Sequence, residues 1–80
     1  MPADLKALTE ELAKALTESP TEVNVVEEGD EECVYLDLEV AENDMGRIIG
    51  KNGRTARALR NILSAAADQD GRRCSLDILD

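Results

Sequence analysis

Two glycines, Gly50 and Gly53, enclose a lysine and an asparagine in the sequence Ile-Ile-Gly-Lys-Asn-Gly-Arg, which covers residues 48–54. Glycine has no Cβ, so the backbone of such a segment can approach a ligand closely and can adopt positive φ angles. Lys51 supplies a mobile positive charge and Asn52 an amide, and both groups contact phosphate oxygens in nucleic-acid complexes. If a helix follows, its first N–H groups add to an anion site. The loop therefore predicts contact with a phosphate chain.

The basic residues of the chain are concentrated around this loop, although the whole chain has a net charge of −9. Residues 45–67 contain five basic residues and no acidic one, whereas residues 1–44 contain 14 acidic residues against two lysines. Salt screens charges beyond about 8 Å at physiological ionic strength, so a ligand at the loop experiences mainly the local positive field. The overall acidity should weaken nonspecific binding to nucleic acid without removing a local site. The basic residues of this segment are Arg47, Lys51, Arg54, Arg57 and Arg60.

The composition argues against catalysis and against metal binding. The chain has no histidine, and its two cysteines, Cys33 and Cys74, lack the CxxC spacing of zinc ligands. No nucleotide-binding G-x-x-x-x-G-K-[ST] loop is present either. We therefore expect no enzyme activity, catalytic residue, cofactor, metal site or small-molecule substrate. The chain opens without a basic signal-peptide region and has no apolar run near the roughly 20 residues of a membrane span, so we expect a cytoplasmic protein.

The spacing of apolar residues predicts three helices. Residues 3–18 have apolar side chains three and four positions apart, which is typical of an amphipathic helix, and Ser19-Pro20 should end it. A short helix over residues 44–49 and a longer one over about residues 54–67 should flank the glycine loop. The longer helix is expected to bury one stripe, made of Ala56, Leu59, Ile62, Leu63 and Ala66.

Three strands complete the prediction. Residues 21–26 and 34–40 should pair as an antiparallel hairpin across an acidic turn at residues 27–32, and a last strand should include residues 74–79. A strand, two helices and a strand form a crossover, which makes the second and third strands parallel. The prediction is one α+β domain over residues 1–80 in the order α-β-β-α-α-β, with a three-stranded mixed sheet and all three helices on one face.

Residues 48–53 resemble the I-G-x-x-G signature of KH domains, and the element order resembles the type II arrangement of that fold. Residues 45–60 resemble more closely the family of small bacterial stand-alone KH proteins known as KhpA or YlqC. The resemblance implies binding of single-stranded RNA without catalysis, a homodimer, and a heterodimer with a larger KH protein of the KhpB, or Jag, type. It also implies a role as an RNA chaperone or post-transcriptional regulator linked to cell elongation and division.

By this resemblance, a strand of about four nucleotides would lie across the loop. The glycines would admit the backbone, the polar and basic side chains would contact phosphates or stack on a base, and the two isoleucines, with Val40, would support bases. Arg60 lies farther from the loop in the sequence. Because no Phe or Trp is available for stacking, we expect affinity on the order of micromolar or weaker. The predicted RNA-binding residues are Gly50, Lys51, Asn52, Gly53, Arg47, Arg54, Arg57, Ile48 and Ile49.

Other interpretations of the same residues stay open at this point. The Gly-x-x-Gly spacing alone also occurs where a glycine ends a helix, and arginines on a helix face can simply be solvated. A protein–protein adaptor that keeps the KH fold, with RNA binding secondary or lost, would suit the acidic surface. A helix-turn-helix reader of duplex DNA is disfavoured, because the net negative charge opposes the high charge density of the duplex.

Overall fold

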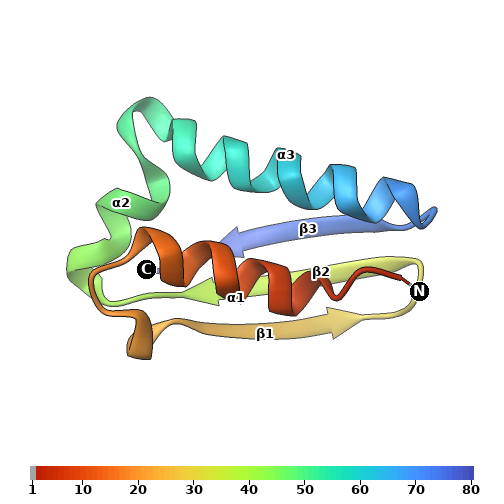
Figure 1. Cartoon of the computed structure of the whole chain (residues 1–80), viewed down its shortest axis with the longest axis horizontal. Helices are drawn as coiled ribbons and strands as arrows, with labels where there is room; N and C mark the ends of the chain where they lie inside the picture. Colours follow the sequence, from red (N-terminus) through yellow and green to blue (C-terminus); the bar gives the residue numbers. More distant parts are fainter. Residues whose placement is uncertain (1) are drawn as a thin grey trace.

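The structure, a computed structural model, describes residues 2–80 as three α-helices and one three-stranded sheet (Figure 1). Their order is the predicted α-β-β-α-α-β. The elements are α1 (Leu5–Leu16), β1 (Asn24–Gly29), β2 (Cys33–Glu39), α2 (Met45–Ile49), α3 (Arg54–Gln69) and β3 (Arg73–Ile78). Short 3₁₀ turns lie at Pro20–Glu22, Glu42–Asp44 and Lys51–Gly53. Within the described part of the chain, no helix has the length and apolar character needed to span a bilayer.

The sheet is mixed, with strand order β1-β2-β3. β1 and β2 are antiparallel, and β2 and β3 are parallel, as the crossover predicts. Helices α1 and α3 lie next to one another over the sheet, and α2 joins the end of β2 to the loop before α3 (Figure 1). The opposite face of the sheet carries exposed side chains such as Val26 and Tyr35. This arrangement is the α+β, type II KH fold. Its core contains Leu5, Val25, Val34, Leu36, Leu38, Ile48, Leu59, Leu63 and Leu76.

The first strand lies later in the chain than the sequence pattern predicts. Residues 20–22 form a 3₁₀ turn, and the strand continues through the acidic residues as far as Gly29, because pairing with β2 uses backbone groups alone. The remaining turn is short. Asp30 Oδ1 accepts hydrogen bonds from the N–H groups of Cys33 and Glu32, each at 2.9 Å. These two bonds hold the pKa of Asp30 below its usual value.

Helix α3 buries a slightly different stripe from the predicted one. Its buried residues are Ala56, Leu59, Leu63 and Ala67. Ile62 is 43% exposed, because the stripe that faces the sheet passes through Leu63 and leaves Ile62 on the flank toward α1. There it borders an apolar groove between the two helices. We call this hollow of about 360 Å³ the α1–α3 groove; it is lined by Leu12, Ala15, Leu16, Arg54, Thr55, Ala58, Leu59 and Ile62.

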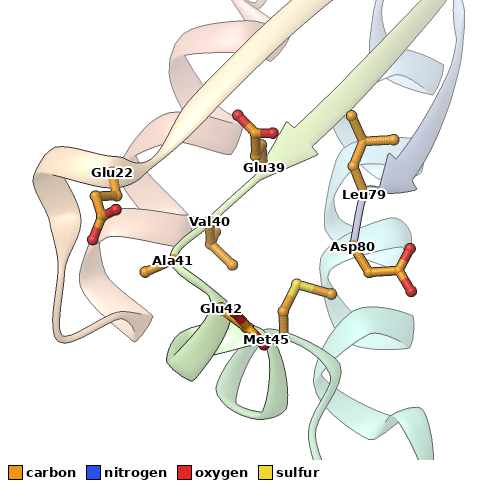
Figure 2. A pocket seen from close by; sticks show the side chains of 8 residues that line it. All are labelled: Glu22, Glu39, Val40, Ala41, Glu42, Met45, Leu79 and Asp80. Carbon is orange, nitrogen blue, oxygen red and sulfur yellow. The ribbon is translucent and has the colours of Figure 1, made fainter.

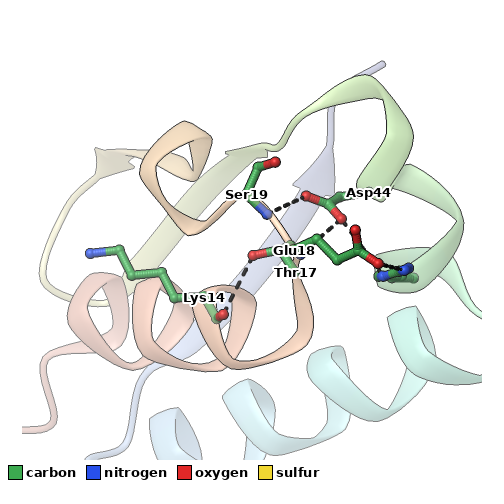
Figure 3. A network of polar contacts seen from close by, with 6 residues as sticks. Lys14, Thr17, Glu18, Ser19 and Asp44 are labelled. Carbon is green, nitrogen blue, oxygen red and sulfur yellow. Dashed lines mark hydrogen bonds and ion pairs between the residues drawn. The ribbon is translucent and has the colours of Figure 1, made fainter.

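A buried carboxylate joins the end of α1 to the start of α2 (Figure 3). Asp44 is 2% exposed and accepts hydrogen bonds from the N–H groups of Glu18 and Ser19, each at 3.0 Å. Arg47 lies one helical turn away, with its Nε 3.8 Å from Asp44 Oδ1, and also forms an ion pair with Glu18. The carboxylate therefore fixes the position of α2, and with it the start of the glycine loop.

A second polar cluster holds the N-terminal segment to the connection between α3 and β3. The N–H of Ala3 donates to Asp70 Oδ2 at 2.8 Å. Arg72 donates to the carbonyl of Ala3 at 2.6 Å and to the same carboxylate at 3.3 Å. The hydrogen bond from Ala3, together with the positive charge of Arg72, lowers the pKa of Asp70.

Candidate nucleic-acid interface

The glycine loop is a tight turn in which three of four successive residues have positive φ angles. Gly50 has φ 75° and ψ 172°, Asn52 has φ 57° and ψ 26°, and Gly53 has φ 74° and ψ 16°. The carbonyl of Lys51 accepts the N–H of Arg54 across the last two of these residues. Two successive left-handed residues inside such a bond define a type I′ turn, for which Asn-Gly is the favoured pair. The local sequence thus determines the shape of the loop.

Glycine occupies positions 50 and 53 for two different structural reasons. A Cβ on Gly50 would lie 2.3 Å from Thr55 Oγ1 and 2.8 Å from the backbone nitrogen of Thr55, so the close packing of the loop on the start of α3 requires glycine. A Cβ on Gly53 would have no neighbour within 4 Å among the described residues. Gly53 therefore leaves open space at the surface, where another backbone can approach.

The start of α3 adjoins this open surface. Within residues 2–80, no side chain caps the helix, whose N-cap is Gly53. The N–H of Arg54, the first residue of the helix, donates to the carbonyl of Lys51, and the helix dipole makes this end positive. A 16-residue helix with such an uncapped start is a suitable site for an anion.

A groove of about 390 Å³, which we call the α3–β3 groove, runs beside the loop. Ile49, Ala56 and Ile78 contribute apolar surface, and Arg57 and Arg60 contribute positive charge. The groove also includes Gly53, so it is continuous with the loop.

One wall of this groove is the edge of the sheet, because β3 has β2 as its neighbour on one side only. The N–H of Arg73 donates to the carbonyl of Glu32, the residue before β2, and the N–H of Leu79 donates to the carbonyl of Leu38 in β2. Backbone groups alternate in direction along a parallel strand, so those of Leu76 and Ile78 face away from β2. The carbonyl of Leu76 accepts a hydrogen bond from Arg60 Nε at 3.2 Å, in agreement with this alternation. The groove thus combines apolar walls with a backbone edge that can form hydrogen bonds.

Several of the predicted site residues lie together at the loop and in the α3–β3 groove. Lys51 and Asn52 are exposed on the loop. Ile49, 40% exposed, and Arg57 line the groove, and Arg57 donates to the carbonyl of Asn52 at 3.3 Å. The ion pairs found among residues 2–80 do not include Lys51, Arg54, Arg57 or Arg60, so these four charges are not neutralised by a neighbouring carboxylate.

Other predicted residues are placed elsewhere. Ile48 is 0% exposed and belongs to the core. The prediction that its side chain supports a base is therefore wrong. Arg54 borders the α1–α3 groove, whereas Arg57, three residues later, lines the α3–β3 groove. Arg47 is on α2, where Glu18 and Asp44 engage its charge.

Val40 does not line the α3–β3 groove either. It faces a separate hollow of about 390 Å³, which contains Met45 and Leu79 together with four carboxylates (Figure 2). These carboxylates belong to Glu22, Glu39, Glu42 and Asp80, and they make this hollow unsuitable for a phosphate chain.

Ala56, Ile78 and Arg60 are not among the RNA-binding residues predicted from the sequence. All three line the α3–β3 groove. A signal for Arg60 was present, because it lies three residues after Arg57 and therefore on a neighbouring part of the same helix surface. Ile78 is distant in the sequence, and only the parallel crossover places β3 alongside α3.

Comparison with known proteins identifies the family. The sequence profile of the KhpA/KhpB KH domain matches residues 6–78. The chain belongs to the KhpA/KhpB family of KH domains. A relative from Halalkalibacterium halodurans, named RNA-binding protein KhpA, is 46% identical over 76 residues, covering 95% of this chain and all of the relative. A Clostridium acetobutylicum protein of the same name is 43% identical and covers 94% of this chain and all of the relative.

Solved structures confirm the fold of this KhpA/KhpB-type domain. The structure of Era in complex with MgGDPNP and nucleotides 1506–1542 of 16S ribosomal RNA superposes with a TM-score of 0.70. The identity is 22%, and the match covers 92% of this chain but 28% of the Era chain. The shared part is therefore a KH-sized portion of a longer protein, and the likeness concerns the fold.

Proposed function

We propose that this chain, as a single KH domain over residues 1–80, binds single-stranded RNA without catalysing a reaction on it. Family membership supports this proposal, because the relatives described above are named RNA-binding proteins. The observation that carries it is the continuous surface formed by the loop of residues 50–53, the uncapped start of α3 and the α3–β3 groove.

In this proposal the phosphates pass over Gly53 and the start of α3, and Lys51 supplies a mobile charge. Bases turn into the α3–β3 groove, where Ile49 and Ile78 offer apolar contact and the arginines offer donors. Arg47 contributes little, because its charge is already paired. The affinity remains weak, since no aromatic side chain lies in the groove to stack on a base.

Reversing charge on the loop tests the proposal. We expect Lys51→Asp/Asn52→Asp to abolish measurable binding of a labelled single-stranded RNA, followed by fluorescence anisotropy at two salt concentrations. The variant should stay folded, because Lys51 is exposed and aspartate, like asparagine, tolerates the left-handed conformation of position 52. With about three phosphate contacts, the slope of log K against log salt should be about −2 in the wild type.

Lys6→Asp/Gln69→Glu is the matched control for this experiment. It changes the net charge by the same amount, at exposed positions on α1 and at the far end of α3. The control should bind RNA nearly as well as the wild type. Equal loss of binding in both variants would mean that net charge alone governs the interaction, and equal retention in both would remove the loop from the site.

We also propose that the domain pairs with a second KH domain, as a homodimer and with a KhpB- or Jag-type protein. The α1–α3 groove supports an association surface, because Leu16 and Ile62 are 39% and 43% exposed beside small alanine side chains. For the homodimer, Ile62→Glu should shift the mass measured by sedimentation from dimer toward monomer. Ala65→Glu, at an exposed position outside the groove lining, is the control. A monomeric wild type would refute this part of the proposal.

The cellular part of the proposal follows the family resemblance: action in the cytoplasm as an RNA chaperone or post-transcriptional regulator linked to cell elongation and division. An adaptor role, with RNA binding secondary, is the alternative, and the acidic surface favours it. The loop variant separates the two in cells. If the folded Lys51→Asp/Asn52→Asp protein restores growth to a deletion strain, the adaptor role is the main one; if it fails to restore growth, RNA binding is.

A further inference from the structure

Resting on the proposed RNA binding, we infer that Arg60 makes the α3–β3 groove selective for a base with two adjacent hydrogen-bond acceptors. Cytosine offers N3 and O2 on its Watson–Crick edge, and guanine offers N7 and O6 on its Hoogsteen edge. Adenine and uracil lack such a pair, because a donor stands beside each acceptor on these edges.

The first argument is the fixed orientation of Arg60. Its Nε–H is held 3.2 Å from the carbonyl of Leu76, a group on the outer edge of β3. Arginine carries five N–H donors in one plane, so this bond leaves the two terminal nitrogens with their donors free. A guanidinium anchored at Nε presents these nitrogens as a pre-organised fork. A fork of this kind matches two acceptors on one edge of a base.

The second argument is that the side chains of the groove offer a base donors and no acceptors. Its side chains are apolar, as in Ile49, Ala56 and Ile78, or are donors only, as in the two arginines. The carbonyl of Leu76 already accepts from Arg60, and that of Asn52 accepts from Arg57 at 3.3 Å. The side chains of the groove therefore favour a base edge with two adjacent acceptors over an edge that places a donor beside an acceptor, as in adenine and uracil.

The experiment measures base preference in wild type and in Arg60→Lys. The probes are labelled uridine hexamers with one central nucleotide replaced by adenosine, cytidine, guanosine or 7-deazaguanosine. We expect the cytidine or the guanosine probe to bind the wild type at least about fivefold more tightly than the adenosine and all-uridine probes, the lower end of the effect of a bidentate arginine contact. If guanosine is the preferred base, replacing N7 by carbon in 7-deazaguanosine should remove its advantage; if cytidine is, the advantage should be seen with that probe alone.

Arg60→Lys keeps the positive charge but loses the planar fork. It should bind the all-uridine probe within about threefold of the wild type and should bind all the probes within about twofold of one another. Arg73→Lys is the matched control, because Arg73 is exposed at the start of β3 and does not line the α3–β3 groove. This control should keep the preference of the wild type.

The possible failures can be distinguished. If no probe binds to the wild type, the proposed RNA binding itself fails. If the wild type binds all probes equally, or if Arg60→Lys keeps the preference, RNA binding stands and the role of Arg60 in base selection is refuted. Far-ultraviolet circular dichroism of each variant separates a change in binding from a loss of fold.

Discussion

Substituting alanine for each glycine near the loop should give three different effects on stability. Gly46→Ala lies in α2, at an ordinary helical conformation with no neighbour within 4 Å among residues 2–80. Gly53→Ala places a Cβ in open space but at φ 74°. Gly50→Ala places one at φ 75° and against the backbone of Thr55. We expect stability to decrease in the order Gly46→Ala, Gly53→Ala, Gly50→Ala.

The magnitudes follow from these environments. Gly46→Ala should stabilise the protein by about 0.5–1 kcal/mol, the usual gain inside a helix. Gly53→Ala should cost about 1–2 kcal/mol, the penalty of a left-handed conformation for a residue with a Cβ. Gly50→Ala carries about 1–3 kcal/mol for an extended conformation with positive φ, which only glycine adopts readily. A contact of 2.8 Å with a backbone nitrogen adds about 1–3 kcal/mol, because the start of α3 must move.

Urea unfolding followed by circular dichroism measures all three variants on one scale. From the centres of these ranges, the difference between Gly50→Ala and Gly53→Ala should be about 2.5 kcal/mol, equivalent to about 10–20 °C in midpoint temperature for a domain of this size. A domain of this length has about 4–12 kcal/mol of total stability, so Gly50→Ala removes a large part of it. If Gly50→Ala is no less stable than Gly53→Ala, the loop is not packed on Thr55 as described, and the reasoning is wrong.

Two further predictions concern carboxylates that hold the chain together. Asp44→Ala should reduce the free energy of unfolding in urea by about 2–4 kcal/mol, because it leaves the N–H groups of Glu18 and Ser19 without their acceptor. The control Asp77→Ala, at an exposed site, should change this free energy by less than about 0.5 kcal/mol. Equal effects of the two substitutions would contradict the role of Asp44. The lowered pKa of Asp70 means that its carboxylate stabilises the fold above its unfolded pKa, near 3.9, and that this contribution is lost as pH falls through the lower folded value. The wild type should therefore exceed Asp70→Asn in unfolding free energy at pH 7 and lose that advantage toward pH 3, and a constant difference would refute the assignment.

Much of the fold could be predicted from the sequence, because the elements follow local patterns. Alternation of apolar residues located β2 and β3, and the helical spacing located α1 and α3. The first strand was misplaced because its outer half contains Glu27 and Glu28, which have no apolar alternation. That half is a strand through its backbone pairing with β2, and this information is not local.

The candidate site was only partly predictable for the same reason. Neighbouring residues determine the conformation of the loop, and its Asn-Gly pair alone favours the observed turn. Whether the side chain of each arginine is paired depends on the residue that contacts it in the folded chain. Arg47 forms an ion pair with Glu18, which follows α1, and Arg60 donates a hydrogen bond to the carbonyl of Leu76 in β3. Neither partner is close to its arginine in the sequence. Sequence reasoning therefore located the loop but could not separate paired charges from available ones.

The structure also shows where the acidic residues behind the net charge of −9 lie relative to the α3–β3 groove. Ile78 lines the α3–β3 groove, and the next two residues, Leu79 and Asp80, line the acidic hollow of Figure 2. An RNA strand whose bases lie in the groove is attracted by Arg57 and Arg60, and the carboxylates beyond the end of β3 repel its phosphates. The attractive path is therefore limited to the loop and the groove. The acidity of the chain therefore restricts the proposed ligand to a short single-stranded segment instead of opposing RNA altogether.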